Sequence, residues 1–106
     1  MDKIKIGNRT FFLGIITSTT FKVLEEQIKG LTIPDPASDG KTDVGDAVLF
    51  ILTAIFDGDE EKAFEVGQEL AQTEIENVKI EQLIEAIEII RRKIEKGLRI
   101  TLYSCL

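Results

Sequence analysis

Residues 44–56 read VGDAVLFILTAIF, a segment with polar side chains only at Asp46 and Thr53. These two positions are seven residues apart, so on a helix they share one face, and every other direction is apolar or small. A surface helix keeps a polar face, whereas a helix that is apolar nearly all round is buried. The segment therefore predicts a central helix that other elements must cover.

Three further helices are expected from apolar residues at helical spacing. The segment 20–30 starts at Thr19 or Thr20, either of which could cap it, and ends at Gly30. The segment 60–72 follows a turn at Gly58, with Asp59 as its cap. Its apolar side consists of Ala63, Phe64, Val66, Gly67, Leu70 and Ala71. The segment 79–96 has the most regular stripe, and Gly97 is expected to stop it; the stripe consists of Ile80, Leu83, Ile84, Ile87, Ile90 and Ile94.

The N-terminal residues 3–13, KIKIGNRTFFL, predict a β-hairpin with a two-residue turn at Gly7-Asn8. This turn places Ile4 opposite Phe11 and gives the hairpin one apolar face, formed by Ile4, Ile6, Phe11 and Leu13. A lone hairpin is marginal in water, so that face must cover the helices. The segment 31–43, which contains both prolines, predicts a flexible loop.

The C-terminal residues 98–106, LRITLYSCL, alternate and are rich in strand formers. They could form a third strand beside the hairpin, a strand given to a neighbouring subunit, or a frayed end. The 106 residues suit a single domain. We therefore expect an α+β fold, mostly α, in which an N-terminal hairpin packs on about four helices with a buried central helix, and which the C-terminal strand could join.

Composition argues against several kinds of function. The chain has no histidine, which removes the commonest general base and zinc ligand, and its single cysteine excludes an internal disulfide. The net charge is −6, with fifteen acids and three bases in residues 31–90 and five bases and one acid in residues 91–106. The acidic middle argues against nucleic acid, and no apolar run approaches the roughly 20 residues that span a bilayer. The apolar run 11–16 is also too short for a secretory signal, so we expect a cytoplasmic protein.

Two acidic clusters partly match calcium loops, which need oxygen ligands at positions 1, 3 and 5, a glycine at 6 and a carboxylate at 12. A loop starting at Asp57 has Lys62 at position 6, where glycine is needed, and Gln68 at position 12, where a carboxylate is needed. A loop over 35–46 fits better but has Ala37 at position 3 and follows Ile33-Pro34 where a helix should end. Helix caps and turns explain both clusters, Asp43 being the cap of the central helix, so we expect no metal, cofactor or catalytic residue.

Candidate interaction residues lie near both ends of the chain. Ile89 lies opposite the stripe of its helix and Arg91 falls inside it. They are either a lone exposed isoleucine and an arginine that reaches back to water, or part of an intermolecular surface. The basic residues could contact an acidic partner or complement the end of the helix dipole. The full set of candidates for partner binding or self-association is Phe12, Ile89, Arg91, Arg92, Ile100, Leu102 and Tyr103.

The order of these segments resembles that of the tail assembly chaperones of long-tailed bacteriophages and prophages. The likeness covers roughly residues 3–96 and rests on KIKIGNRTFFL (3–13), TFKVLEEQI (20–28), VGDAVLFILTAIFDGDEEKAF (44–64) and IEQLIEAIEIIRRKI (80–94). It implies a non-enzymatic protein of the host cytoplasm that binds the tape measure and tail tube proteins and can self-associate into a homo-oligomer. The tail 98–106 departs from the family pattern. The residues alone leave two alternatives open: a monomeric adaptor or inhibitor with one protein partner, and a calcium-responsive module.

Overall fold

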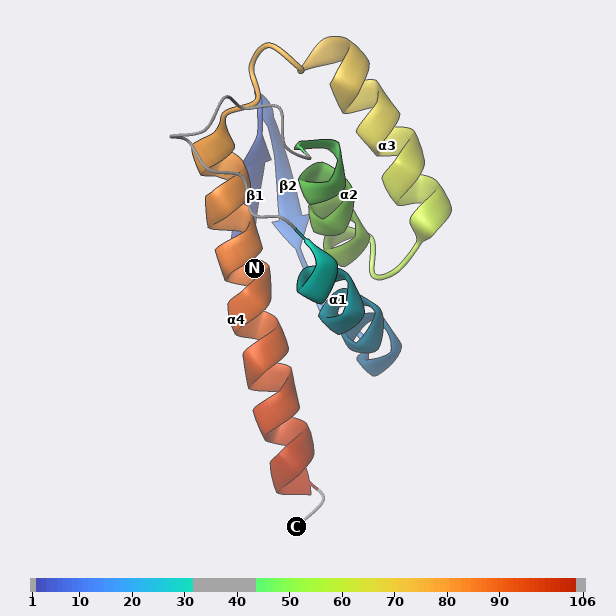
Figure 1. The fold of residues 1–106 in the computed structure, drawn as a ribbon, viewed down its shortest axis with the longest axis vertical. Coiled ribbons are helices and arrows are strands. Elements are labelled where there is room, and N and C mark those ends of the chain that lie inside the picture. The colour runs from blue at the N-terminus through green and yellow to red at the C-terminus, as the bar shows by residue number, and fades with distance from the viewer. Residues whose placement is uncertain (1, 32–43, 105–106) are drawn as a thin grey trace.

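The computed structural model describes residues 2–31 and 44–104. In chain order its elements are β1 (Asp2–Ile6), β2 (Arg9–Leu13), α1 (Ser18–Gly30), α2 (Val44–Ile55), α3 (Glu60–Thr73) and α4 (Ile80–Ser104) (Figure 1). A two-stranded antiparallel hairpin thus packs with four helices, which confirms the predicted α+β, mostly helical fold. Within the described part of the chain, none of the helices combines the length and apolar character needed to cross a membrane.

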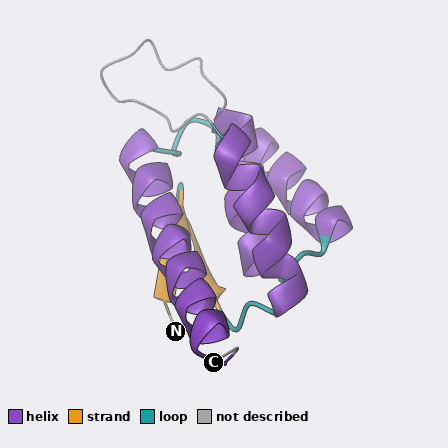
Figure 2. Cartoon of the chain, turned by 60° about the horizontal axis from the view of Figure 1, so that its bottom comes forward, coloured by secondary structure: helices purple, strands orange, loops and turns teal. Residues whose placement is uncertain are grey.

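The hairpin has the predicted register. Ile4 pairs with Phe11, and the four residues of the predicted apolar face are all buried. Gly7 adopts φ +65°, a left-handed conformation that a two-residue hairpin turn requires of its first residue and that glycine adopts without strain. The strand β1 contacts α4 and β2 contacts α2, so the hairpin covers the gap between these helices (Figures 1 and 2).

A side-chain amide of α4 fastens the hairpin turn. Gln82 Oε1 accepts a hydrogen bond from the Gly7 N–H at 2.9 Å, and Gln82 Nε2 donates to the Gly7 carbonyl at 3.1 Å. The same Oε1 accepts from the Lys79 N–H at 3.2 Å, which satisfies an orphan donor at the start of α4. The Asn8 N–H donates to Glu74 at 3.1 Å. The turn is therefore tied to the beginning of α4 and to the segment before it.

The helix α2 is the predicted central element. It contacts α1, α3, α4 and β2, and Figure 1 shows it between α4 and α3. Thr53 is buried within it, and its hydroxyl donates to the Leu49 carbonyl at 2.7 Å, so the one polar side chain in its interior turns is satisfied. The buried residues of the helix are Ala47, Val48, Phe50, Ile51, Leu52, Thr53 and Ala54.

The predicted start of the first helix is wrong. The helix α1 begins at Ser18, with Thr17 at the N-cap position, and not at Thr19 or Thr20. The Thr17 hydroxyl donates to Asp57 at 3.1 Å instead of capping the helix, and Thr20 is buried inside the first turns. A contact between residues 40 positions apart therefore fixes this end, which local sequence does not reveal.

The predicted strand at 98–106 is also wrong for the residues that the structure describes, because α4 continues through Gly97 to Ser104. A strand gains stability only from a neighbour, whereas a helix that is already nucleated adds one hydrogen bond for each residue it fixes. Apart from Leu31, whose N–H donates to Ile28 at the end of α1, the predicted loop 31–43 lies outside the described residues, as do residues 105–106.

Truncating a central residue of α2 will test this packing. Leu52 is fully buried, so Leu52→Ala should lower the free energy of unfolding by about 2–5 kcal/mol, measured by urea denaturation. The control is Leu49→Ala in the same helix, where the side chain is 37% exposed and the loss should be about 1 kcal/mol or less. Equal losses for the two variants would contradict the central placement of α2.

Candidate protein-binding groove

An apolar groove of about 290 Å³ lies between α2 and α3 and continues to the connection between α3 and α4. Three of its side chains are large, apolar and exposed: Phe64 at 59%, Ile75 at 58% and Leu49 at 37%. Among the residues that the structure describes, none that lines the groove is charged. We refer to this surface as the α2–α3 groove, and it is lined by Val44, Gly45, Val48, Leu49, Phe64, Gly67, Gln68, Leu70, Ala71, Ile75 and Val78.

The groove exists because the apolar side of α3 is wider than its contact with α2. Ala63, Val66 and Leu70 are buried, and they form the stripe that packs against the core. Phe64 and Ala71, which the sequence places on the same side, are exposed. At 100° per residue they fall on a second stripe beside the first. One stripe of α3 therefore covers α2, and the other remains open along the groove.

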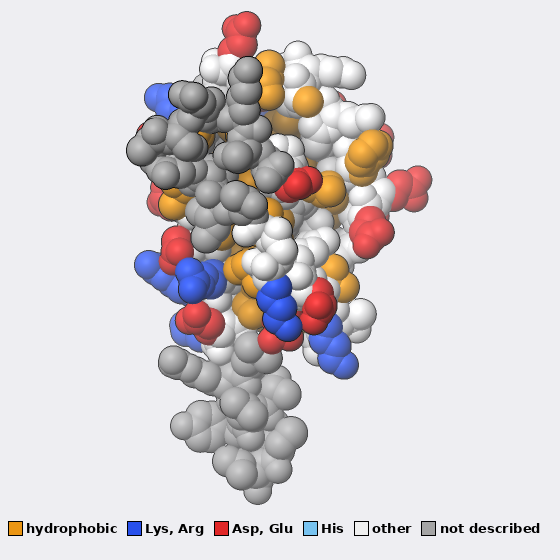
Figure 3. Space-filling view, viewed as in Figure 1, with side chains coloured by type: hydrophobic (Ala, Val, Ile, Leu, Met, Phe, Trp, Pro, Cys, Tyr) orange, Lys and Arg blue, Asp and Glu red, His pale blue; other side chains and the backbone are white. Residues whose placement is uncertain are grey.

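The part of the chain that forms the α2–α3 groove is rich in acidic residues. Residues 44–79 contain nine acids and two bases, a net charge of −7. Glu60, Glu61 and Glu65 lie within about one helical turn of Phe64. The only base of α3, Lys62, places its ammonium 5.0 Å from the centre of the Phe56 ring. Figure 3 shows acidic side chains beside apolar ones over α3, while most basic side chains gather lower on this face.

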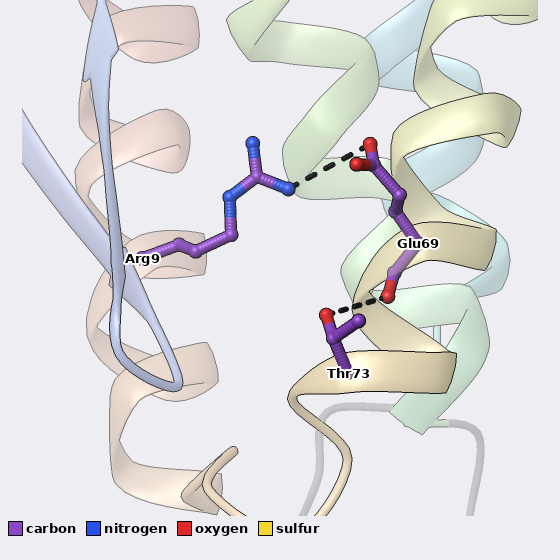
Figure 4. A network of polar contacts seen from close by, with 3 residues as sticks. All are labelled: Arg9, Glu69 and Thr73. Atoms are coloured by element: carbon purple, nitrogen blue, oxygen red, sulfur yellow. Dashed lines mark hydrogen bonds and ion pairs between the residues drawn. The ribbon is translucent and has the colours of Figure 1, made fainter.

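The side of α3 that faces the hairpin makes polar contacts. Arg9 of β2 reaches Glu69, with 3.8 Å between Nη1 and Oε2, and the Thr73 hydroxyl donates to the Glu69 carbonyl at 2.8 Å (Figure 4). Both partners of the ion pair are well exposed, so it adds little to stability. Glu69, the acid in this contact, lies on a side of α3 that does not line the groove.

The acidic cluster at 57–61 forms the junction between α2 and α3. Asp57 and Gly58 have φ values of +50° and +84°, which turn the chain sharply. Asp59 accepts a hydrogen bond from the Lys62 N–H at 3.1 Å, which confirms the predicted cap. Asp57 accepts from the Thr17 N–H at 2.9 Å and so joins this junction to the start of α1. Among the described residues, no group of three or more His, Cys, Asp or Glu is placed to hold a metal ion.

The structure does not bring the predicted interaction residues together. Phe12 is 54% exposed on the outer face of the hairpin. Ile89 is half-buried and packs against the core, so the expectation of a lone exposed isoleucine is wrong. The hairpin lies beside this face of α4, and a hollow between them is lined by Lys3, Lys5 and Ile89 among others.

The basic residues of α4 lie away from the α2–α3 groove. Arg91 is exposed and pairs with Glu88 at 3.5 Å and Glu95 at 3.8 Å on its own helix, which agrees with an arginine that reaches back to water. Arg92 is exposed beside a second hollow on α4. The remaining predicted residues, Ile100, Leu102 and Tyr103, lie on the C-terminal turns of α4 and not on a strand.

Sequence reasoning missed the exposed residues of the groove, namely Leu49, Phe64 and Ile75. The available signal was the width of the apolar side of segment 60–72, which exceeds what one helix contact can bury. Comparison of the chain with protein-family models, with curated proteins and with solved structures finds no match. The case for a function therefore rests on the residues themselves.

The junction carboxylate gives a pH-dependent prediction. The Thr17 N–H lowers the pKa of Asp57 most; burial opposes this effect, and the hydroxyls of Thr20 and Thr17 reinforce it. A pKa that is lower in the folded than in the unfolded chain stabilises the fold above about pH 3.9, and this contribution is lost as pH falls through the lowered value. Wild type should therefore lose more stability than Asp57→Asn between about pH 5 and pH 2.5 in urea denaturation.

The variant Glu65→Gln, on the exposed face of α3, is the matched control and should follow the wild-type pH profile. If Asp57→Asn also followed that profile, the contact between Asp57 and Thr17 would not contribute to stability in solution.

Proposed function

We propose that this chain is a non-enzymatic tail assembly chaperone of a long-tailed phage or prophage, which binds the tape measure and tail tube proteins during tail assembly. The observation that carries the proposal is the α2–α3 groove, an apolar surface whose described lining residues carry no charge, on a protein with 30% charged residues. The order and character of the sequence segments, which resemble those of that family, supply the identity of the partners.

The shape of the groove suits a helix from a client protein. Phe64, Gln68 and Ala71 follow at spacings of four and three residues, so the lining runs along about two turns of α3 and continues to Ile75 beyond the end of that helix. An amphipathic helix binds such a groove through anchors at i, i+3 or i+4, and i+7. A shallow groove of about 290 Å³ holds a row of two or three such side chains better than a small molecule, which needs an enclosing pocket.

The charges of the chain suit a chaperone. A long helical client with an uncovered apolar stripe aggregates unless another surface covers that stripe. Phe64 and Ile75 supply apolar contact area, and the glutamates beside Phe64 stay at the rim, where they keep water. The net charge of −6 favours the solubility of the complex with its client.

The alternative function is a monomeric adaptor or inhibitor, because a groove of this size serves one partner helix equally well. The two functions differ in association. A chaperone that coats a long client associates with other copies, whereas an adaptor remains a single species at all concentrations. Light scattering of the purified chain over a range of concentrations separates them.

Co-expression with a client tests the proposed function. The tape measure protein of the same tail gene cluster should become soluble with wild type and elute with it. Phe64→Glu should weaken this binding by about tenfold or more, because it places a charge in the apolar surface. Phe12→Glu is the matched control, since Phe12 is similarly exposed but lies on the hairpin, and it should bind like wild type.

Two results would count against this assignment. If wild type neither solubilises nor binds the tape measure protein, the proposed function is wrong. If Phe12→Glu loses binding and Phe64→Glu keeps it, the client binds the outer face of the hairpin and not the α2–α3 groove.

A further inference from the structure

Three glutamates lie beside the open stripe of α3. Among the described elements, α3 packs against α2 alone, so no other described element covers its stripe with Phe64. At 100° per residue, Glu60 and Glu61 fall about 40° and about 60° from Phe64, on opposite sides and one turn before it. Glu65 follows Phe64 directly, and all three glutamates are exposed. In the described part of the chain none of the three forms an ion pair.

The opposite end of the α2–α3 groove is also acidic. Because α2 and α3 are joined by the short turn 56–59, the start of α2 lies beside the end of α3, and the groove there is lined by Val44 and Ile75. Asp46 lies three residues before Leu49, so the two residues share one side of α2, and Asp46 is exposed. Glu76 follows Ile75 directly and is exposed as well. Carboxylates therefore lie near both ends of the groove.

This arrangement separates affinity from selectivity. The described residues that line the groove carry no charge, so apolar anchors of a partner helix bind there whatever their flanks carry. A lysine or arginine beyond the anchors meets a carboxylate at either end, whereas a glutamate or aspartate there meets a like charge. Charges at a rim act mainly on the rate of encounter and on the choice of partner, and salt screens them. The surface therefore fits an apolar helix with basic flanks.

We propose that the α2–α3 groove is selective for charge, and that it takes a helix of a foreign protein whose row of two or three apolar anchors has lysine or arginine on both sides. This inference deepens the proposed function, and rests on it for the use of the groove as a helix-binding site. It adds which helices of a long client the groove covers, namely those with basic flanks, and which it leaves uncovered, namely those with acidic flanks.

Two synthetic peptides test the selectivity. Both form an alanine-rich helix with leucine anchors at i, i+4 and i+7, and the anchors are flanked on both sides by lysines in one peptide and by glutamates in the other. Fluorescence anisotropy measures the Kd of each labelled peptide with the full-length protein. At about 0.05 M salt wild type should bind the lysine peptide about tenfold or more tightly than the glutamate peptide, and at about 0.5 M this ratio should fall to about threefold or less.

The net charge of −6 would also attract any lysine peptide, so two double variants locate the effect. Glu61→Lys with Glu65→Lys reverses two charges beside Phe64. Glu26→Lys with Glu85→Lys changes the net charge equally on α1 and α4, at exposed positions that do not line the groove. At low salt the first variant should bind the two peptides about equally, whereas the second should keep most of the wild-type preference. Circular dichroism verifies that the helices remain in both.

Phe64→Glu identifies the surface that the peptides occupy. It should lose the lysine peptide, while Phe12→Glu on the hairpin should bind it like wild type. The inference is overturned if neither peptide binds wild type, if both bind equally, if the two double variants behave alike, or if Phe64→Glu keeps the lysine peptide.

The binding of the tape measure protein decides the proposed function separately. If that protein binds wild type but not Phe64→Glu while the peptides reveal no preference, the proposed function stands and this inference alone fails. If the preference is found and the tape measure protein does not bind, the groove selects basic-flanked helices of another client, and the proposed function alone fails. If neither is found, both fail.

Discussion

The burial of α2 is the constraint on which the rest of the structure depends. Its twelve residues carry almost no polar side chain, and leaving such a helix in water would cost about 1.5–3 kcal/mol for each large apolar side chain exposed. Contacts with α1, α3, α4 and β2 remove most of that surface from water. The hairpin owes its place to the same need, because its apolar face lies over the gap between α2 and α4, and Gln82 holds the turn in register through both backbone groups of Gly7.

Covering α2 also creates the candidate site. A helix can turn only one stripe toward its neighbour. In α3 the stripe that packs against α2 consists of Ala63, Val66 and Leu70. The adjacent apolar stripe, which includes Phe64, does not cover α2 and stays exposed to water. Together with Leu49 on the solvent side of α2, it lines a groove whose described residues carry no charge, and glutamates lie close to Phe64 along α3. Surface of this kind is a typical location for protein contacts.

Much of the fold could be predicted from the sequence because its signals are local. The hairpin register follows from the turn at Gly7-Asn8, and the cap at Asp59 and the position of α2 follow from residue type and spacing. The errors have non-local causes. The start of α1 depends on the contact of Thr17 with Asp57, the burial of Ile89 depends on where the hairpin lies, and the helical state of residues 98–104 reflects continuation of a long helix over a local preference for strand. The groove was missed because the excess width of one apolar side does not show which stripe stays exposed.

The distribution of charge restricts which surfaces can contact the α2–α3 groove. Two copies of the unit 44–79, each at −7, repel one another when their grooves face, so a symmetric pair through this surface has a cost that rises as salt is lowered. The same acidic rim selects among foreign helices, since it favours an apolar stripe with basic flanks over one with acidic flanks. The fold and the charge thus both determine which helices can bind. The packing of α3 leaves an apolar stripe open, and the glutamates beside that stripe restrict which helices can cover it.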